Sequence, residues 1–423
     1  MTKPRTIIIG LDGVPFYLLK NLAQKNIMPN TSKLIKESRF NQMSSSIPEV
    51  SSVAWSSIIT GCNPAEHGIF GFTDFPPNTY RLSFPNFSSL KKPAFWHKDK
   101  KKTHIIINVP STFPVKELNG VHISGFVSLD LQRSVWPKEL IPKLKEFDYR
   151  LDVDSQKAHQ SMGLFLADLD KTLDARIKTS QYLWEIYDWS IFMLVFTGTD
   201  RLMHFLWDSC IDENHKYHSQ FLNHFRKIDR HIGEILSKKK PEDKLIMVSD
   251  HGFESLDKDV YINFLLKEKG FLTLKSKNRP NFSNIDFPTK AFSLDPARIY
   301  INMKGKYPQG SITGDDHNNI RGDLISLFEG LKIEGRKAIR DIYKKEDIYR
   351  GPYIESAPDL VLVADRGFNL KSSLSSQSLY SKGIFSGKHT QHDAFLLVNG
   401  LTDDKIPKKP DVCDVCSLIE DRG

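Results

Sequence analysis

The sequence has few cysteines and no long apolar run. Four cysteines among 423 residues are too few and too scattered for a disulfide framework. One CxxC pair, Cys413 and Cys416, has no second pair with which to complete a zinc site. The apolar run at residues 7–9 is far shorter than a signal-peptide core or a membrane span. These absences argue against a disulfide-stabilised scaffold and against membrane anchoring, and they favour a cytoplasmic location.

The sequence also lacks a strong charge bias and a dinucleotide-binding motif. Its net charge of +8 is modest for the length, and short lysine runs such as 100–102 and 238–240 are typical of solvated surfaces. We therefore expect no nucleic-acid partner, although a basic surface attracts small anionic substrates. No GxGxxG follows the first apolar run, so a dinucleotide-binding fold loses its main support.

Short apolar runs alternate with helical stretches along the chain. The runs lie near residues 7, 105, 193, 247, 361 and 396. Continuous β-branched runs of this kind are typical of strands buried on both faces of a parallel sheet. The alternation predicts an α/β fold with one large, mostly parallel sheet sandwiched by helices. Because no repeat or low-complexity linker interrupts the chain, we expect a single domain over 1–423, with cap elements inserted at about 74–150 and 258–385.

One stretch combines a hydroxyl group with the start of a short helix. Pro48 ends the preceding segment, and Ser51 or Ser52 is predicted to be the N-cap of a helix. Residues 53–59 have the apolar spacing of a short helix, which is predicted to end at Gly61. The unpaired N–H groups and the positive end of the helix dipole favour a phosphoryl oxygen at this position. A lone serine before a helix is usually only a cap, so a catalytic role depends on residues elsewhere.

Carboxylates and imidazoles follow several of the predicted strands. These candidate ligands are Asp12, Asp200, His204, Asp250, His251 and His389. Open α/β sheets bind their ligands at the carboxyl ends of the strands, where most of these residues are placed. Asp200 and His204 are four residues apart, so a helix would put both on one face, where they can chelate a metal ion. Taken alone, Asp12 could be a turn residue and His389 would be a weak candidate.

Other histidines are assigned no metal role. His215 and His218 are flanked by charges on a helix that we expect to be exposed. His67 and His392 lie near the motifs but are interpreted as structural.

Together these residues resemble, in order and local context, the alkaline phosphatase superfamily, and most closely its type I phosphodiesterase/nucleotide pyrophosphatase branch. The resemblance runs from residue 7 to about residue 400. Its motifs are Ile-Gly-Leu-Asp12-Gly, the Ser51 helix with Thr60-Gly61-Cys-Asn-Pro64-Ala-Glu-His67-Gly68-Ile, Thr199-Asp200 with His204, Ser249-Asp250-His251-Gly252, and Gly387-Lys-His389. No Cys-x-Pro-x-Arg sulfatase signature is present, because Cys62 is followed by Asn-Pro-Ala.

The resemblance implies an alkaline phosphatase-like fold and a hydrolase with two divalent metal ions, zinc before manganese or iron. One ion would be held by Asp200, His204 and His389. The other would be held by Asp12, Asp250 and His251, with the Ser51 oxygen completing the set. Ser51 would attack phosphorus in a small-molecule phosphate ester and form a phosphoseryl intermediate, and a diester or pyrophosphate is favoured over a monoester.

Two positions depart from the family pattern. Nucleotide pyrophosphatases typically have threonine as the nucleophile and an asparagine three residues later, whereas this chain has Ser51 and Ala54. Nucleotide specificity is therefore in doubt, and Ser52 is an adjacent rival for the nucleophile. The alternatives are a phosphomonoesterase, phosphomutase or phosphonate hydrolase on the same metal core, or a non-catalytic nucleotide-binding protein. The oligomeric state is not predicted.

Overall fold

A computed structural model describes residues 4–276, 278 and 280–420. The chain divides into two compact units. The first comprises Met1–Cys62, Asn86–Phe253 and His389–Gly423, and the second comprises Asn63–Pro85 and Glu254–Lys388.

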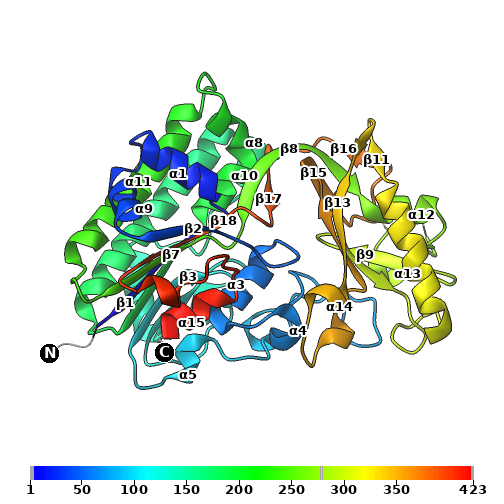
Figure 1. Ribbon diagram of the computed structural model, residues 1–423, viewed down its shortest axis with the longest axis horizontal. Helices are drawn as coiled ribbons and strands as arrows, with labels where there is room; N and C mark the ends of the chain where they lie inside the picture. Colours follow the sequence, from blue (N-terminus) through cyan, green and yellow to red (C-terminus); the bar gives the residue numbers. More distant parts are fainter. Residues whose placement is uncertain (1–3, 277, 279, 421–423) are drawn as a thin grey trace. The chain divides into compact units, whose positions relative to one another are not determined.

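The first unit is built on an eight-stranded sheet (Figure 1). In spatial order its strands are β2 (Arg39–Met43), β18 (Ala394–Asn399), β7 (Lys244–Val248), β1 (Thr6–Leu11), β6 (Ile191–Phe196), β3 (His104–Val109), β4 (Gly120–Ser124) and β5 (Val135–Trp136). The five strands from β7 to β4 are parallel, and β18, β2 and β5 run antiparallel to their neighbours. The predicted fold class, a large and mostly parallel sheet with helices, is confirmed.

Helices cover both faces of this sheet (Figure 1). The main ones are α1 (Phe16–Gln24), α2 (Pro29–Lys36), α3 (Ser51–Thr60), α9 (Met162–Ile186), α10 (Gly198–Ile211), α11 (His218–Lys238) and α15 (Asp414–Glu420), with short helices α5 (Phe95–Lys98), α6 (Leu131–Ser134), α7 (Ile141–Glu146) and α8 (Gln156–Gln160). One core joins α3 and α15 to alternate strand residues such as Ile8, Ile106 and Met193. Helices α9 and α11 lie on the other face (Figure 1). Strand side chains buried on both faces explain why these strands are apolar throughout.

Helix α3 begins differently from the prediction. The N-cap is Val50, whose carbonyl accepts the N–H groups of Val53 and Ala54, and no side chain caps the helix. The prediction that Ser51 or Ser52 is the cap is therefore wrong, because the helix starts one residue earlier. Ser51 is the first helical residue, so its hydroxyl is free to bond elsewhere. Gly61 ends the helix in the left-handed conformation with φ of 71°, as predicted.

The second unit has its own sheets. One has the order β13 (Ile339–Lys344), β14 (Leu360–Ala364), β10 (Arg298–Ile301) and β9 (Ala291–Leu294), and all its neighbours are antiparallel. In the other, β8 (Gly252–Tyr261) pairs with β15 (Gly367–Lys371) and β16 (Tyr380–Ser381). Its other α-helices and strands are α4 (Pro64–His67), α12 (Ile262–Glu268), α13 (Gly314–Glu329), β11 (Lys332–Ile333), β12 (Arg336–Lys337) and α14 (Lys345–Ile348). Strand β17 (Gly387–Thr390) begins in this unit, and its last two residues, His389 and Thr390, belong to the first unit.

One predicted strand is assigned to the wrong sheet. The run near residue 361 forms β14 as predicted, but it belongs to this antiparallel sheet and not to the large one. All five residues of β14 are buried, so its composition matches that of a central parallel strand.

None of the helices in the described ranges is long and apolar enough to cross a bilayer. The cytoplasmic location stays a prediction.

Candidate metal centre and nucleophile

All seven side chains singled out in the sequence lie in the first unit, on segments that leave its sheet or pack against it. Asp12 directly follows β1, Asp250 and His251 follow β7, Asp200 and His204 lie on α10 after β6, Ser51 begins α3, and His389 lies on β17. Because β1, β6 and β7 are adjacent and parallel, their carboxyl ends meet at one edge of the sheet.

The first group contains Asp12, Asp250 and His251. The Nε2 atom of His251 lies 3.8 Å from Asp12 Oδ1 and 3.4 Å from Asp250 Oδ2. Ser51 Oγ completes the group, at 3.2 Å from His251 Nε2 and 3.5 Å from Asp12 Oδ1. The four atoms therefore face one another, and all four side chains are buried.

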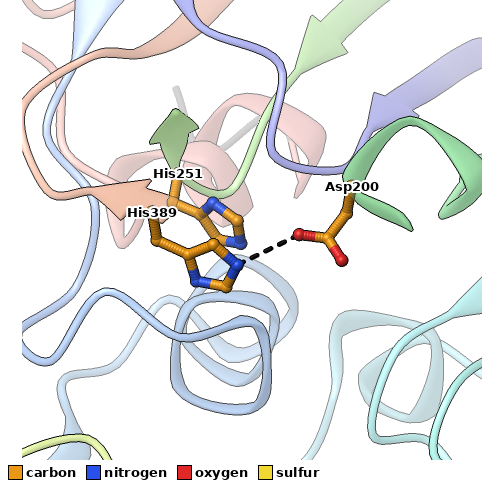
Figure 2. Close-up of side chains that lie close together, drawn as sticks. All are labelled: Asp200, His251 and His389. Atoms are coloured by element: carbon orange, nitrogen blue, oxygen red, sulfur yellow. Dashed lines mark hydrogen bonds and ion pairs between the residues drawn. The ribbon is translucent and has the colours of Figure 1, made fainter. Parts of the chain in front are cut away.

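The second group contains Asp200, His204 and His389. His389 Nε2 lies 3.0 Å from Asp200 Oδ1 and 3.0 Å from His204 Nε2, and His204 Nε2 is 3.5 Å from the same carboxylate oxygen. Figure 2 shows the His389 ring lying against His251 with its Nε2 directed at Asp200. The two rings are stacked with centroids 3.7 Å apart, so His251 stands within reach of both groups.

The spacing of these atoms fits metal coordination. Ligand bonds of about 2.0–2.2 Å in a tetrahedral site place the ligand atoms roughly 3.3–3.6 Å apart, close to the distances in both groups. Asp250 Oδ2 is buried and has no hydrogen-bond partner among the described residues. A buried carboxylate oxygen that accepts no hydrogen bond is costly unless a cation neutralises it. The donor set of carboxylate and imidazole suits zinc, with manganese or iron as rivals.

Two of the imidazoles are oriented as metal ligands. Nδ1 of His251 lies 3.1 Å from the Gly252 carbonyl, and Nδ1 of His389 lies 3.0 Å from the Glu49 carbonyl. An N–H on Nδ1 that donates to a carbonyl leaves the lone pair on Nε2 directed into the cluster. Both rings therefore present Nε2 to their group.

The carboxylates are crowded enough to perturb their protonation. Burial, together with the negative charges of Asp250 and Asp200, raises the pKa of Asp12 well above its usual value. Burial likewise raises the pKa of Asp250 to about 7. Asp200 behaves oppositely: although burial would raise its pKa, the imidazoles of His204 and His389 hold it well below the usual range. A cation between these groups is what would keep Asp12 and Asp250 ionised together.

Further residues hold the aspartates in place, and two of them, Trp55 and Arg201, have no role predicted from the sequence. Trp55 Nε1 donates to Asp12 Oδ2 at 3.0 Å, the N–H of Gly13 donates to Asp250 Oδ1 at 3.0 Å, and Arg201 Nη1 donates to Asp200 Oδ2 at 3.2 Å. Trp55 follows Ser51 by one helical turn, and Arg201 directly follows Asp200. The sequence alone does not show that the Trp55 and Arg201 side chains point towards the aspartates.

The residues interpreted as structural lie outside both groups. Nδ1 of His67 accepts the N–H of Ile69, and Nδ1 of His215 accepts the N–H of Tyr217. Neither these histidines, nor His218, nor the two cysteines of the CxxC pair, belong to a metal-ligand group among the described residues. The rival serine, Ser52, has a buried hydroxyl that makes no hydrogen bond within the described chain.

A family model matches nearly the whole chain. The model, described as type I phosphodiesterase/nucleotide pyrophosphatase, covers residues 6–391. The chain belongs to this family. It is accordingly an enzyme of the metal-dependent phosphoric ester hydrolases, as predicted. No curated protein sequence matches the chain.

Solved structures of low sequence identity share the fold. Phosphonoacetate hydrolase from Sinorhizobium meliloti 1021, in complex with phosphonoformate, matches with a TM-score of 0.65 and 14% identity, covering 98% of this chain and 95% of that one. Murine ectonucleotide pyrophosphatase/phosphodiesterase 5 matches with a TM-score of 0.55 and 15% identity, covering 98% and 94%. The human protein of the same name matches with a TM-score of 0.56 and 14% identity, covering 98% and 93%.

Proposed function

We propose that this protein is a phosphodiesterase that uses two divalent metal ions, zinc before manganese or iron, and Ser51 as its nucleophile. The observation that carries the proposal is the position of Ser51 Oγ, 3.2 Å from His251 Nε2 and 3.5 Å from Asp12 Oδ1. A serine that merely capped its helix would direct its oxygen at a backbone N–H two or three residues later. Here the hydroxyl faces the candidate ligand group instead.

The two ligand groups would each hold one ion. Asp12, Asp250, His251 and Ser51 would hold the first, and Asp200, His204 and His389 the second. When bound, such ions lower the pKa of a coordinated hydroxyl and stabilise negative charge on the phosphoryl group. The chain supplies the fixed positions, because each aspartate and two of the histidines are held by a second hydrogen bond.

The proposed reaction has two displacement steps at phosphorus. Ser51 Oγ attacks phosphorus, the bond from phosphorus to one alcohol oxygen breaks, and that alcohol leaves with a proton. Water then attacks the phosphoseryl group, breaks its bond to Ser51 Oγ, and restores the hydroxyl. The backbone N–H groups of Ser51 and Ser52, at the start of α3, have no acceptor among the described residues and are available to a phosphoryl oxygen.

The substrate proposed is a small-molecule phosphodiester. Ala54 stands where nucleotide pyrophosphatases typically have an asparagine, and its side chain is fully buried in the core under α3. The corresponding contact to the phosphoryl oxygen is therefore missing, which weakens the case for a nucleotide substrate. A panel of bis-p-nitrophenyl phosphate, p-nitrophenyl phosphate and a phenylphosphonate ester separates diester, monoester and phosphonate hydrolysis. A wide preference for the monoester would contradict the proposal.

The nucleophile is tested by a matched pair of serine variants. We expect Ser51→Ala to lower kcat for bis-p-nitrophenyl phosphate by at least about a thousandfold, because no other hydroxyl occupies its position. Ser52→Ala removes the neighbouring hydroxyl, which makes no hydrogen bond, and should leave kcat within about threefold. Metal content is measured in both variants. Wild-type turnover in Ser51→Ala with metal bound would contradict nucleophilic catalysis by Ser51.

A further inference from the structure

A pocket in the first unit adjoins the second ligand group. Its volume is about 460 Å³, and it is lined by the segments 126–131 and 149–155 together with Arg201. Apolar and aromatic side chains, among them Phe126, Leu131 and Tyr149, make up about half of the lining. The charged residues of the lining are Asp152, Asp154 and Arg201.

Arg201 connects the pocket to Asp200. Its Nε and Nη2 donate to Asp152 Oδ2 at 3.2 and 3.0 Å, its Nη1 donates to Asp200 Oδ2 at 3.2 Å, and its guanidinium lies 4.1 Å from the centre of the Phe126 ring. These contacts hold the guanidinium in one orientation. They use three of its five N–H groups, so one N–H on each terminal nitrogen has no acceptor among the described residues.

The charge of the lining disfavours an anionic occupant. Arg201 carries one positive charge and shares it between the carboxylates of Asp152 and Asp200. Asp200 belongs to the second ligand group and is left out of the count. The lining itself then has two negative charges, on Asp152 and Asp154, against the one positive charge of Arg201. A phosphate or carboxylate placed here would meet the negative charges of Asp152 and Asp154, and the one cation of the lining, Arg201, is already paired. A neutral oxygen can still accept one of the free N–H groups of Arg201.

We propose that this pocket receives one organic substituent of the phosphodiester, and that Arg201 with Asp152 selects a neutral, oxygen-bearing substituent over an anionic one. This inference rests on the proposed diesterase function and sharpens it. The preferred substrates are diesters of neutral alcohols, with a compact and partly apolar group that carries a hydroxyl or ether oxygen. Compounds in which that substituent is itself a phosphate, as in a pyrophosphate bond, are disfavoured.

Two matched substrates test the proposal on the full-length, zinc-loaded enzyme. They are 4-nitrophenyl 4-(hydroxymethyl)phenyl phosphate and its 4-carboxyphenyl counterpart, which differ in one charged group of similar size. We expect kcat/KM to be about tenfold higher for the hydroxymethyl compound. Equal values, or a preference for the carboxylate, would overturn the inference.

Two aspartate variants assign the preference to the pocket. Asp152→Asn removes one negative charge while keeping an oxygen for Arg201, and we expect it to reduce the discrimination between the two substrates to about threefold or less. Asp148→Asn is the matched control, because Asp148 has an exposed side chain outside the lining and should leave the discrimination unchanged. If the ratio of kcat/KM for the hydroxymethyl substrate to kcat/KM for the carboxyl substrate is the same in both variants, Asp152 does not select the substituent.

Equilibrium binding separates this inference from the proposed function. Zinc-loaded Ser51→Ala is titrated with 4-(hydroxymethyl)phenyl methylphosphonate and with 4-carboxyphenyl methylphosphonate, neither of which requires turnover. We expect the first to bind about tenfold more tightly. Unselective binding contradicts the pocket assignment even if Ser51 proves to be the nucleophile. Selective binding supports it even if Ser51→Ala retains full activity and the nucleophile proposal fails.

Discussion

In each aspartate of the two ligand groups, one carboxylate oxygen accepts a hydrogen bond from a neighbouring residue and the other faces the histidines. Asp12 Oδ2 accepts from Trp55, Asp250 Oδ1 accepts from Gly13, and Asp200 Oδ2 accepts from Arg201. The remaining oxygen of each carboxylate faces the histidine Nε2 atoms. Carboxylates restrained in this way lose little side-chain entropy when they bind an ion, so affinity depends on the donors as well as on the ligands.

Replacing Trp55 by phenylalanine tests this restraint. The change removes the N–H that holds Asp12 but keeps an aromatic ring in the buried site. We expect zinc affinity at the first group to fall by about tenfold or more, measured by calorimetric titration of metal-free protein. Trp96→Phe is the control, because its indole N–H is buried without a hydrogen-bond partner among the described residues. Equal zinc affinity in the two variants would show that the Trp55 N–H does not position Asp12 for metal binding.

The candidate ligand residues can be chosen from the sequence, whereas the residues that hold them in place cannot. Asp250 and His251 directly follow an apolar strand, and such a position is informative without a structure. The bond from Trp55 to Asp12 joins residues 43 positions apart and depends on the direction of an indole ring. The sequence predicts Ser51 or Ser52 as the N-cap, because a serine at a helix start has that role most often, whereas the structure has Val50 at that position.

At the scale of elements, strand identity could be predicted better than strand partners. The runs near residues 105 and 361 have the same continuous apolar character, and both form strands. The first lies in the central parallel sheet and the second in an antiparallel sheet of the other unit. Burial on both faces determines composition, but composition does not record which strand is the neighbour.

The C-terminal end of α3 offers a stability test. Gly61 has φ of 71°, and a Cβ there would lie 2.9 Å from Cys416 Cβ on α15. Gly61→Ala should therefore incur both backbone strain and a collision, lowering the free energy of unfolding by about 2–4 kcal/mol. Gly270→Ala is the comparison, since Gly270 also has φ of 71° but no atom within 4 Å of its Cβ position, and should cost about 1 kcal/mol. Urea unfolding measures both, and equal losses would contradict the packing of α15 on α3.

At the scale of the molecule, buried neutral histidines link stability to pH. His122 is fully buried beside Phe87 and Trp96, and burial lowers its pKa to about 3. Its ordinary pKa is 6.5, so between these values the unfolded chain binds a proton that the folded chain does not. The contribution of neutral His122 to the free energy of unfolding is complete above pH 6.5 and is lost progressively as the pH falls towards 3.

Replacing His122 by phenylalanine tests this linkage in metal-free protein. We expect the stability difference between His122→Phe and wild type to shift in favour of the variant by about 2 kcal/mol between pH 7 and pH 4.5, measured by urea unfolding. His159→Phe, at an exposed position, should show a much smaller shift. A difference for His122→Phe that does not change with pH would show that His122 is not held neutral in the folded state.

The central claim is that residues spread from position 12 to position 389 converge on two metal ions beside Ser51. The most direct measurement is the metal content of the purified full-length protein by elemental analysis, in wild type and in Asp250→Asn. The account predicts about two divalent ions per chain in wild type and about one in Asp250→Asn, with the second group still filled. No bound metal in wild type, or an unchanged content in the variant, would contradict it.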